Sequence, residues 1–209
     1  MLCIYHLCYR TFFANASGYP LPRRGSNLLG EWIQSLRTGW LTGVMHGLTY
    51  LGGAFVLTAA TLALVSIFLF VCRRRADALV LGVCMLGAFG LSQLLKTSFH
   101  RPRPPLPWLV GTSGYSFPSG HALLTMSLFG FLAYLAMRHG RRSFPSLTGI
   151  VALLSLPVLV GVSRVYLGVH YPTDVLGGWI VAVAWVGTCI MAREFLTSKK
   201  GTAAKSTAP

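Results

Sequence analysis

The sequence predicts an all-α integral membrane protein, a bundle of about six transmembrane helices with an interfacial amphipathic helix. Of its 209 residues, 54% are hydrophobic and only 11% are charged, a composition well outside that of soluble proteins. The apolar residues gather in segments near the length of about 20 residues that a helix needs to cross a bilayer. Short basic clusters separate several of these segments.

The amino-terminal part holds the predicted surface helix. Residues 1–13 are moderately apolar but too short to span a bilayer. Residues 28–40 carry apolar side chains at helical spacing between polar ones, which predicts an amphipathic helix on the membrane surface. Those apolar residues are Leu28, Leu29, Trp32, Ile33, Leu36 and Trp40.

Five apolar segments are predicted to span: 43–72, 78–95, 122–137, 147–162 and 175–191. Basic clusters follow the first, third and fifth segments, at alternate connections. Because such clusters mark the cytoplasmic side, residues 96–118 and 164–174 are expected together on the opposite face. The predicted location is the cell membrane, plasma or inner, with a multi-pass topology.

Domain organisation is predicted to be simple. Residues 1–195 form one membrane-embedded domain, and residues 196–209 form a small, polar and basic tail that is expected to be disordered in the cytoplasm. The net charge of +14 does not indicate a nucleic-acid partner. A nucleic-acid binder needs a continuous solvated basic face, whereas here apolar segments separate the clusters.

One stretch, residues 163–174, brings ionisable side chains next to membrane-length apolar sequence, which marks it as functional. It contains Arg164, His170 and Asp174. The last two are four residues apart, one helical turn if Pro172 opens the last helix, so the carboxylate would reach the imidazole N–H. A neutral imidazole oriented in this way can act as a nucleophile on phosphorus.

Two further groups are expected on the same face. Lys96 and Arg103 add cations with few carboxylates to pair them, and Ser119 with Gly120 marks a helix N-terminus. Guanidinium groups and free N–H groups at a helix N-terminus both favour an anion, and a phosphate fits them.

His121 could then protonate the leaving oxygen as a general acid. Lys96, Arg103 and Arg164 would offset the phosphoryl charge. Neither the carboxylates nor the five cysteines have metal-ligand spacing, so we expect no metal and no cofactor.

Taken together, these residues resemble the signature of the type-2 phosphatidic acid phosphatase superfamily. The first part is Lys96, then six residues, then Arg103 and Pro104; the second is residues 118–121; the third is residues 163–174. Each part alone is weak, but the three in this order and spacing are highly specific.

The resemblance implies a metal-independent membrane phosphatase with a bundle of about six transmembrane helices, in which His170 becomes a phosphohistidine that water hydrolyses. In this family a complete spanning helix precedes the surface helix, so with residues 1–13 either that first helix is truncated or only five helices span. It implies that Asp174 supports this nucleophile and that His121 protonates the leaving group. The phosphate-binding residues that it implies are Lys96, Arg103, Ser119, Gly120 and Arg164.

The expected partner is a phosphorylated membrane lipid, with undecaprenyl pyrophosphate preferred. Phosphatidylglycerophosphate or phosphatidic acid are alternatives, as are a lipid phosphotransferase on the same scaffold and an anionic-lipid binder or transporter without turnover. A soluble haloperoxidase is disfavoured by the spanning segments. Oligomeric state and source stay open.

Residues near the signature have simpler interpretations. Arg101 is expected to be a solvated loop charge that adds to the local field. Trp108 and Tyr115 fit an interfacial aromatic belt better than a lipid entrance. The roles of Tyr166 and Tyr171 are left undecided.

Overall fold

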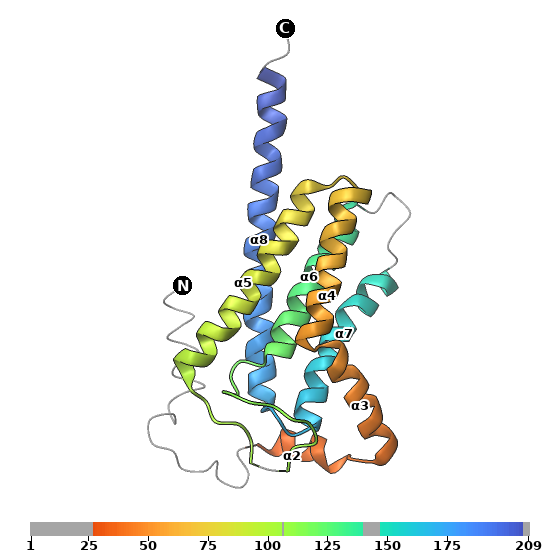
Figure 1. The fold of residues 1–209 in the computed structure, drawn as a ribbon, viewed down its shortest axis with the longest axis vertical. Coiled ribbons are helices and arrows are strands. Elements are labelled where there is room, and N and C mark those ends of the chain that lie inside the picture. Colours follow the sequence, from red (N-terminus) through yellow and green to blue (C-terminus); the bar gives the residue numbers. More distant parts are fainter. Residues whose placement is uncertain (1–26, 106, 140–146, 207–209) are drawn as a thin grey trace.

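The computed structural model describes residues 27–105, 107–139 and 147–206. These residues confirm the predicted all-helical membrane fold (Figure 1). In chain order the helices are α2 (Leu28–Ser35), α3 (Gly39–Leu51), α4 (Ala54–Ser66), the π-helical continuation η1 (Ile67–Val71), α5 (Arg75–Phe99), α6 (Gly120–His139), α7 (Leu147–Tyr166) and α8 (Pro172–Ser206).

Within these residues, five helical stretches are long and apolar enough to cross a membrane. They are Ala54–Val71, Arg75–Phe99, Gly120–His139, Thr148–Tyr166 and Pro172–Phe195. Residues 1–13, on which the expectation of a truncated first helix depends, lie outside the described part of the chain.

The first apolar segment, residues 43–72, is predicted as one helix, but the structure divides it into two. α3 ends at Leu51 and α4 begins at Ala54, with Gly52 and Gly53 between them. Apolar composition is continuous through the break, so hydropathy does not reveal it, whereas two adjacent glycines favour it. A Cβ added at Gly52 would lie 3.1 Å from Cδ2 of His121, so the break brings backbone close to a predicted site residue.

The predicted surface helix over residues 28–40 is also two elements. α2 ends at Ser35, Thr38 is extended, and Trp40 belongs to α3. The Thr38 N–H donates to the Tyr166 hydroxyl at 3.1 Å. The helix is therefore interrupted where the chain contacts α7, although the periodicity of the sequence predicts one continuous helix.

α6 lies at the centre of the bundle and packs against α5, α7 and α8. The largest buried cluster joins Leu81 of α5, Phe131 of α6 and Val186 of α8, with Leu57 of α4 at its edge. α8 runs on to Ser206, so the residues from 196 to 206, expected to be disordered, are helical.

The ends of four helices meet at one end of the bundle. The carboxyl ends of α5 and α7 lie beside the amino ends of α6 and α8, and the connection between α5 and α6 crosses this end (Figure 1). The three parts of the signature are carried on these helix ends and on the connections beside them.

Candidate active site

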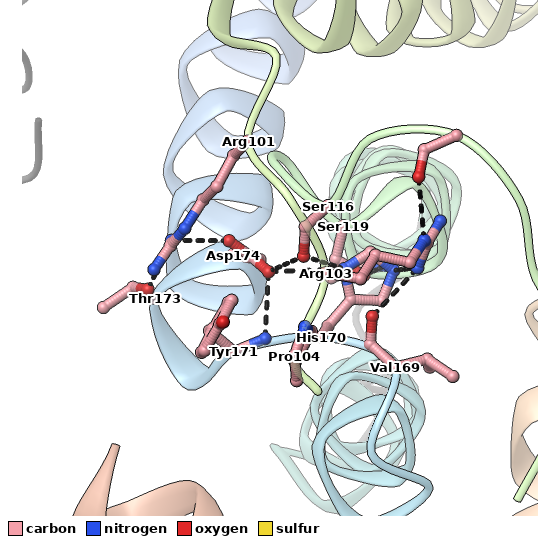
Figure 2. Close-up of polar contacts among 12 residues, drawn as sticks. Arg101, Arg103, Pro104, Ser116, Ser119, Val169, His170, Tyr171, Thr173 and Asp174 are labelled. Carbon is pink, nitrogen blue, oxygen red and sulfur yellow. Dashed lines mark hydrogen bonds and ion pairs between the residues drawn. The ribbon is translucent and has the colours of Figure 1, made fainter. Parts of the chain in front are cut away.

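His170 and Asp174 form the centre of this region. His170 lies in the turn before α8 and is 2% exposed, while Asp174 lies in the first turn of α8 and is fully buried. Pro172 opens α8 as expected, and the imidazole Nδ1 lies 3.5 Å from Asp174 Oδ2 (Figure 2). The predicted meeting of imidazole and carboxylate is present.

The other ring nitrogen of His170 faces Arg103. Arg103 Nη1 lies 3.3 Å from His170 Nε2. Because a guanidinium can only donate, Nε2 carries the lone pair and Nδ1 carries the hydrogen that faces the Asp174 carboxylate. Burial lowers the pKa of His170 to about 4, outweighing the opposing effect of Asp174. The imidazole is therefore neutral at pH 7, with its nucleophilic nitrogen turned toward a cation.

Backbone carbonyls hold Arg103 in place. Its Nε donates to Gly114 O at 2.9 Å, Nη2 to Ser113 O at 2.8 Å and Nη1 to Val169 O at 2.9 Å. The last carbonyl belongs to the residue before His170. Because a planar guanidinium has a fixed donor geometry, these contacts fix its position relative to Nε2.

Arg164, in the last turn of α7, is 3% exposed. Its Nη1 donates to Thr49 Oγ1 at 2.6 Å. Its Nε is buried and has no hydrogen-bond partner within the described residues. Leaving a buried donor unsatisfied costs about 1–3 kcal/mol or more when it is charged, so this side chain suits an anion.

Lys96 lies in the last turn of α5, beside the start of α6. A Cβ added at Gly120 would lie 3.7 Å from Lys96 Nζ, so the missing side chain leaves room for the ammonium group. The electrostatic neighbours of Lys96 include Arg103 and Arg164. Three cations from three separate segments therefore gather at one place.

Ser119 and Gly120 are at the start of α6, as the sequence predicts. The Ser119 N–H, however, donates to the backbone carbonyl of Asp174 at 3.0 Å. This donor therefore ties α6 to α8 rather than being available to an anion, which revises the expectation of free N–H groups at Ser119.

His121 follows in the first turn of α6 and is half-buried. Four groups act on it electrostatically: Arg164, His170, Lys96 and Arg103. All eight residues selected from the sequence thus lie in one region. Within the described residues, no three His, Cys, Asp or Glu side chains gather as a possible metal site. Metal independence stays a prediction.

The expectation for Arg101 is wrong. Its side chain is only 27% exposed and pairs with Asp174, Nη1 to Oδ1, at 2.7 Å. Sequence analysis also missed Ser116, whose hydroxyl donates to Asp174 Oδ2. No spacing rule predicts either contact, because both depend on how the connection between α5 and α6 folds against α8.

The aromatic residues left open have distinct positions. Tyr166 is 1% exposed and its hydroxyl contacts Thr42 at 3.0 Å, which ties α7 to α3. Tyr171 lies under the Arg101 guanidinium, 4.3 Å from ring centroid to Cζ. Trp108 donates to Pro104 O at 2.8 Å, and Tyr115 packs edge-on against His100.

A membrane-spanning helix bundle that holds a buried imidazole–carboxylate pair among cations defines a class of integral membrane proteins built to handle a phosphate group. The PAP2 superfamily model matches residues 77–197, more than half of the chain, and the chain belongs to that superfamily. It is a membrane phosphatase, and the resemblance noted from the sequence is confirmed.

Curated relatives agree. The chain is 36% identical over 154 residues to "Phosphatidylglycerophosphatase B" of Bacillus subtilis, covering 69% of this chain and 71% of the relative. It is 31% identical over 157 residues to "Undecaprenyl-diphosphatase" of Sulfolobus acidocaldarius, covering 70% and 67%.

Solved structures are similar as well. A transmembrane PAP2-type phosphatidylglycerolphosphate phosphatase from Bacillus subtilis superposes with a TM-score of 0.78 at 27% identity, over 92% of this chain and 94% of that one. LpxE of Aquifex aeolicus shares the fold, with a TM-score of 0.65 at 24% identity, over 83% and 99% of the two chains.

Proposed function

We propose that this protein hydrolyses the phosphate or pyrophosphate group of a membrane lipid, without a metal, through a phosphohistidine on His170. The observation that carries the proposal is the orientation of the imidazole. Nδ1 faces Asp174 at 3.5 Å, and Nε2 lies 3.3 Å from Arg103. A nucleophile held between an orienting carboxylate and a phosphate-binding cation suits phosphoryl transfer through a covalent intermediate.

In the first step the Nε2 lone pair attacks phosphorus, and a nitrogen–phosphorus bond forms. The bond from phosphorus to the leaving oxygen breaks, and His121, which is protonated when the anionic phosphate is bound, donates a proton to that oxygen. Asp174 stabilises the positive charge that develops on the His170 ring through the Nδ1 hydrogen.

In the second step a water molecule attacks the phosphohistidine. His121, now neutral, takes a proton from the water, the nitrogen–phosphorus bond breaks, and the electron pair returns to Nε2. Inorganic phosphate leaves and both imidazoles regain their starting states. The same residue acts first as an acid and then as a base, as microscopic reversibility permits.

Three cations are proposed to stabilise the transferring group. Arg103 lies beside Nε2, the buried Nε of Arg164 has no partner among the described residues, and Lys96 lies against the start of α6. Fixed donors aimed at developing charge commonly contribute a factor of about 10²–10³ each to kcat. They replace the role that a metal ion has in other phosphatases.

An apolar groove supports a lipid as the substrate. It has a volume of about 390 Å³ between α4, α5 and α6, and extends from Ala54, just after the Gly52 break, to Val65. Leu124, one turn after His121 on α6, lines it. A hydrocarbon chain leaving the reacting phosphate near His121 could follow this groove along the bundle.

For the headgroup, the sequence-based preference is undecaprenyl pyrophosphate, and a relative with the name undecaprenyl-diphosphatase supports it. Phosphatidylglycerophosphate is the second candidate. It is favoured by the higher identity to a relative named for that activity and by the similar solved structure. Both substrates place a phosphorus with a lipid leaving group at the same site.

We further propose that the site faces away from the cytoplasm, in a cell membrane. Arg73 and Arg74 precede α5, Arg75 begins it, and Arg138 lies near the end of α6, so these basic residues are at the end of the bundle opposite the site. Clusters of this kind favour the cytoplasmic side.

The test is phosphate release by purified protein in detergent with a chelator, from undecaprenyl pyrophosphate and from phosphatidylglycerophosphate. We expect release by wild type and none above background by His170→Ala. The preferred lipid identifies the headgroup. Equal release by the variant would contradict the mechanism, and binding of lipid without any turnover would favour the binder or transporter. Transfer to an added lipid alcohol would indicate a phosphotransferase.

A further inference from the structure

Arg101 is held against the face of Asp174 that points away from His170. Its Nη1 donates to Asp174 Oδ1 at 2.7 Å and to Thr173 Oγ1 at 2.8 Å. Asp174 Oδ2, the other oxygen, faces Nδ1 of His170. Figure 2 shows Arg101 on one side of the carboxylate, and His170 with Arg103 on the other. Two arginines two residues apart in sequence therefore contact opposite ends of one carboxylate–imidazole pair.

The backbone of Arg101 also acts on this carboxylate. Its carbonyl accepts the Ser116 N–H at 2.8 Å, and the Ser116 hydroxyl donates to Asp174 Oδ2. The Tyr171 N–H donates to the same oxygen at 2.9 Å. Each oxygen of Asp174 thus has its own fixed donors, so the carboxylate cannot rotate without losing several hydrogen bonds.

The Arg101 guanidinium is itself fixed. It lies over the ring of Tyr171 at 4.3 Å, a geometry that favours a cation. Tyr171 is 7% exposed, so this support is rigid. The guanidinium acts electrostatically on Asp174 and Tyr171, whereas the charges that act on His121 come from Arg164, His170, Lys96 and Arg103. Arg101 therefore acts on the Asp174 carboxylate and is not one of the proposed phosphate-binding cations.

We infer that Arg101 is a positioning residue for phosphoryl transfer: it holds the Asp174 carboxylate in the orientation and ionised state that keep the His170 Nδ1 hydrogen in place and Nε2 free to attack. This inference rests on the proposed phosphohistidine function. The groups that face the pair from every neighbouring element are Lys96 of α5, Arg101, Arg103 and Ser116 of the following connection, His121 of α6, Arg164 of α7, and Tyr171 with Thr173 at the start of α8.

The sign of the effect on titration follows from Coulomb's law. Arg101 partly neutralises the field of Asp174 at the imidazole. Removing its charge leaves the carboxylate more attractive to a proton on His170, so the imidazole protonates at higher pH. Because only the neutral imidazole can attack, the acid limb of the kcat/KM profile moves upward.

The experiment compares wild type with Arg101→Gln and Arg101→Lys, with Arg74→Gln as control. Arg74 is an exposed arginine at the other end of the bundle. For Arg101→Gln we expect kcat to fall by about tenfold to a hundredfold, as when a partner that orients a reacting group is removed. We expect KM and inhibition by inorganic phosphate to change by less than about threefold. Arg101→Lys keeps the charge and recovers part of kcat, and Arg74→Gln matches wild type.

Two pH measurements complete the test. In Arg101→Gln the acid limb of kcat/KM moves up by about one unit. The same shift is expected for the His170 ring resonances in NMR of histidine-labelled protein, a readout that needs no substrate and stays informative if the proposed substrates are wrong.

An unchanged His170 titration in folded Arg101→Gln would overturn the inference. So would weaker phosphate inhibition with kcat unchanged, since that pattern belongs to a phosphate ligand. If His170→Ala kept its turnover, the proposed function would be wrong. The His170 titration in Arg101→Gln would still decide the role of Arg101. Thermal unfolding in detergent identifies a variant that has simply lost its fold. In that case Arg101→Lys carries the test through kinetics: a reduced kcat with KM and phosphate inhibition unchanged supports positioning, and weaker phosphate inhibition with kcat unchanged overturns it.

Discussion

Buried charges gather at both ends of α5, and the two groups differ in balance. At the amino end, Asp77 Oδ1 accepts from Arg193 Nη2 at 2.7 Å, and Oδ2 lies 2.8 Å from His139 Nε2. Beside this buried pair, Glu194 and Arg138 pair at 2.7 Å, with side chains that are 41% and 37% exposed. At the carboxyl end, Asp174 pairs with Arg101, and three further cations gather near it: Lys96, Arg103 and Arg164.

This difference separates a structural role from a binding role. The group around Asp77 joins α5, α6 and α8, and its acids and bases satisfy one another, as buried charges in a fold must. The group around Asp174 has an excess of positive charge and, at Arg164, a buried donor with no partner among the described residues. An uncompensated cluster is costly to the folded protein unless an anion completes it, so it indicates a binding site.

The largest effect that separates the two ends is expected for His170→Ala. Loss of the attacking nitrogen should reduce kcat by about 10⁴-fold or more, because no nearby group replaces a covalent nucleophile. His139→Ala, a histidine at the other end, is the matched control and should lose far less. If the two variants lost similar factors in kcat, the two ends of α5 would not differ in function. Phosphate release under saturating lipid provides the measurement.

A smaller loss is expected for Arg164→Ala. Removing this cation should lower kcat/KM by about 10²–10³-fold, since its charge is proposed to act in the transition state. Arg164→Lys should recover little, because one ammonium nitrogen cannot occupy the positions of both Nη1, which contacts Thr49, and Nε, which is proposed to face the phosphate. Full recovery by lysine would show that charge alone is needed.

At the other end, Arg193→Met should act on stability and not on chemistry. Arg193 is 4% exposed and Asp77 is 2% exposed, so the variant leaves a buried carboxylate poorly compensated. We expect a loss of about 3–5 kcal/mol in the free energy of unfolding, with kcat of the folded fraction nearly unchanged.

The double variant Asp77→Leu with Arg193→Met should recover stability, since an apolar pair can replace a buried ion pair. Thermal unfolding in detergent and the assay of phosphate release check both variants. A large fall in kcat at full folding would mean that the Asp77 group takes part in the reaction.

The smallest effect concerns pH. The pKa of His170, about 4 in the folded protein against an ordinary value of 6.5, is lowered chiefly by burial. The neutral, reactive form is therefore present above the folded pKa and is lost only as pH falls through about 4. We expect no loss of kcat/KM from this residue between about pH 7 and pH 5. An acid limb of kcat/KM near pH 6.5 that coincides with the titration of the His170 resonances would contradict a pKa lowered by burial.

The parts of the site that follow local rules could be predicted from sequence. His170 and Asp174 meet because a helix brings residues four apart to one face, and Pro172 opens that helix. Lys96 and Arg164 share one end of the bundle because spanning segments alternate in direction. These are consequences of helix geometry and membrane topology, and both can be read without knowledge of tertiary packing.

The remaining features depend on tertiary packing. Arg101 and Ser116 reach Asp174 only because the connection between α5 and α6 folds back across the start of α8. The break at Gly52 lies within uniformly apolar sequence, so its place against His121 is a packing event. Hydrophobic periodicity carries no information on such contacts, and the family signature uses Arg103, so the sequence predicts Arg101 in solvent.

Trapping the phosphorylated protein tests the phosphohistidine on His170 most directly. Wild type and His170→Ala would be mixed with lipid carrying labelled phosphate, quenched in alkali, in which phosphohistidine survives, and mapped by mass spectrometry. We expect label on His170 in wild type and none in the variant. Label on another residue, or turnover with no phosphorylated protein at any quench time, would contradict this expectation.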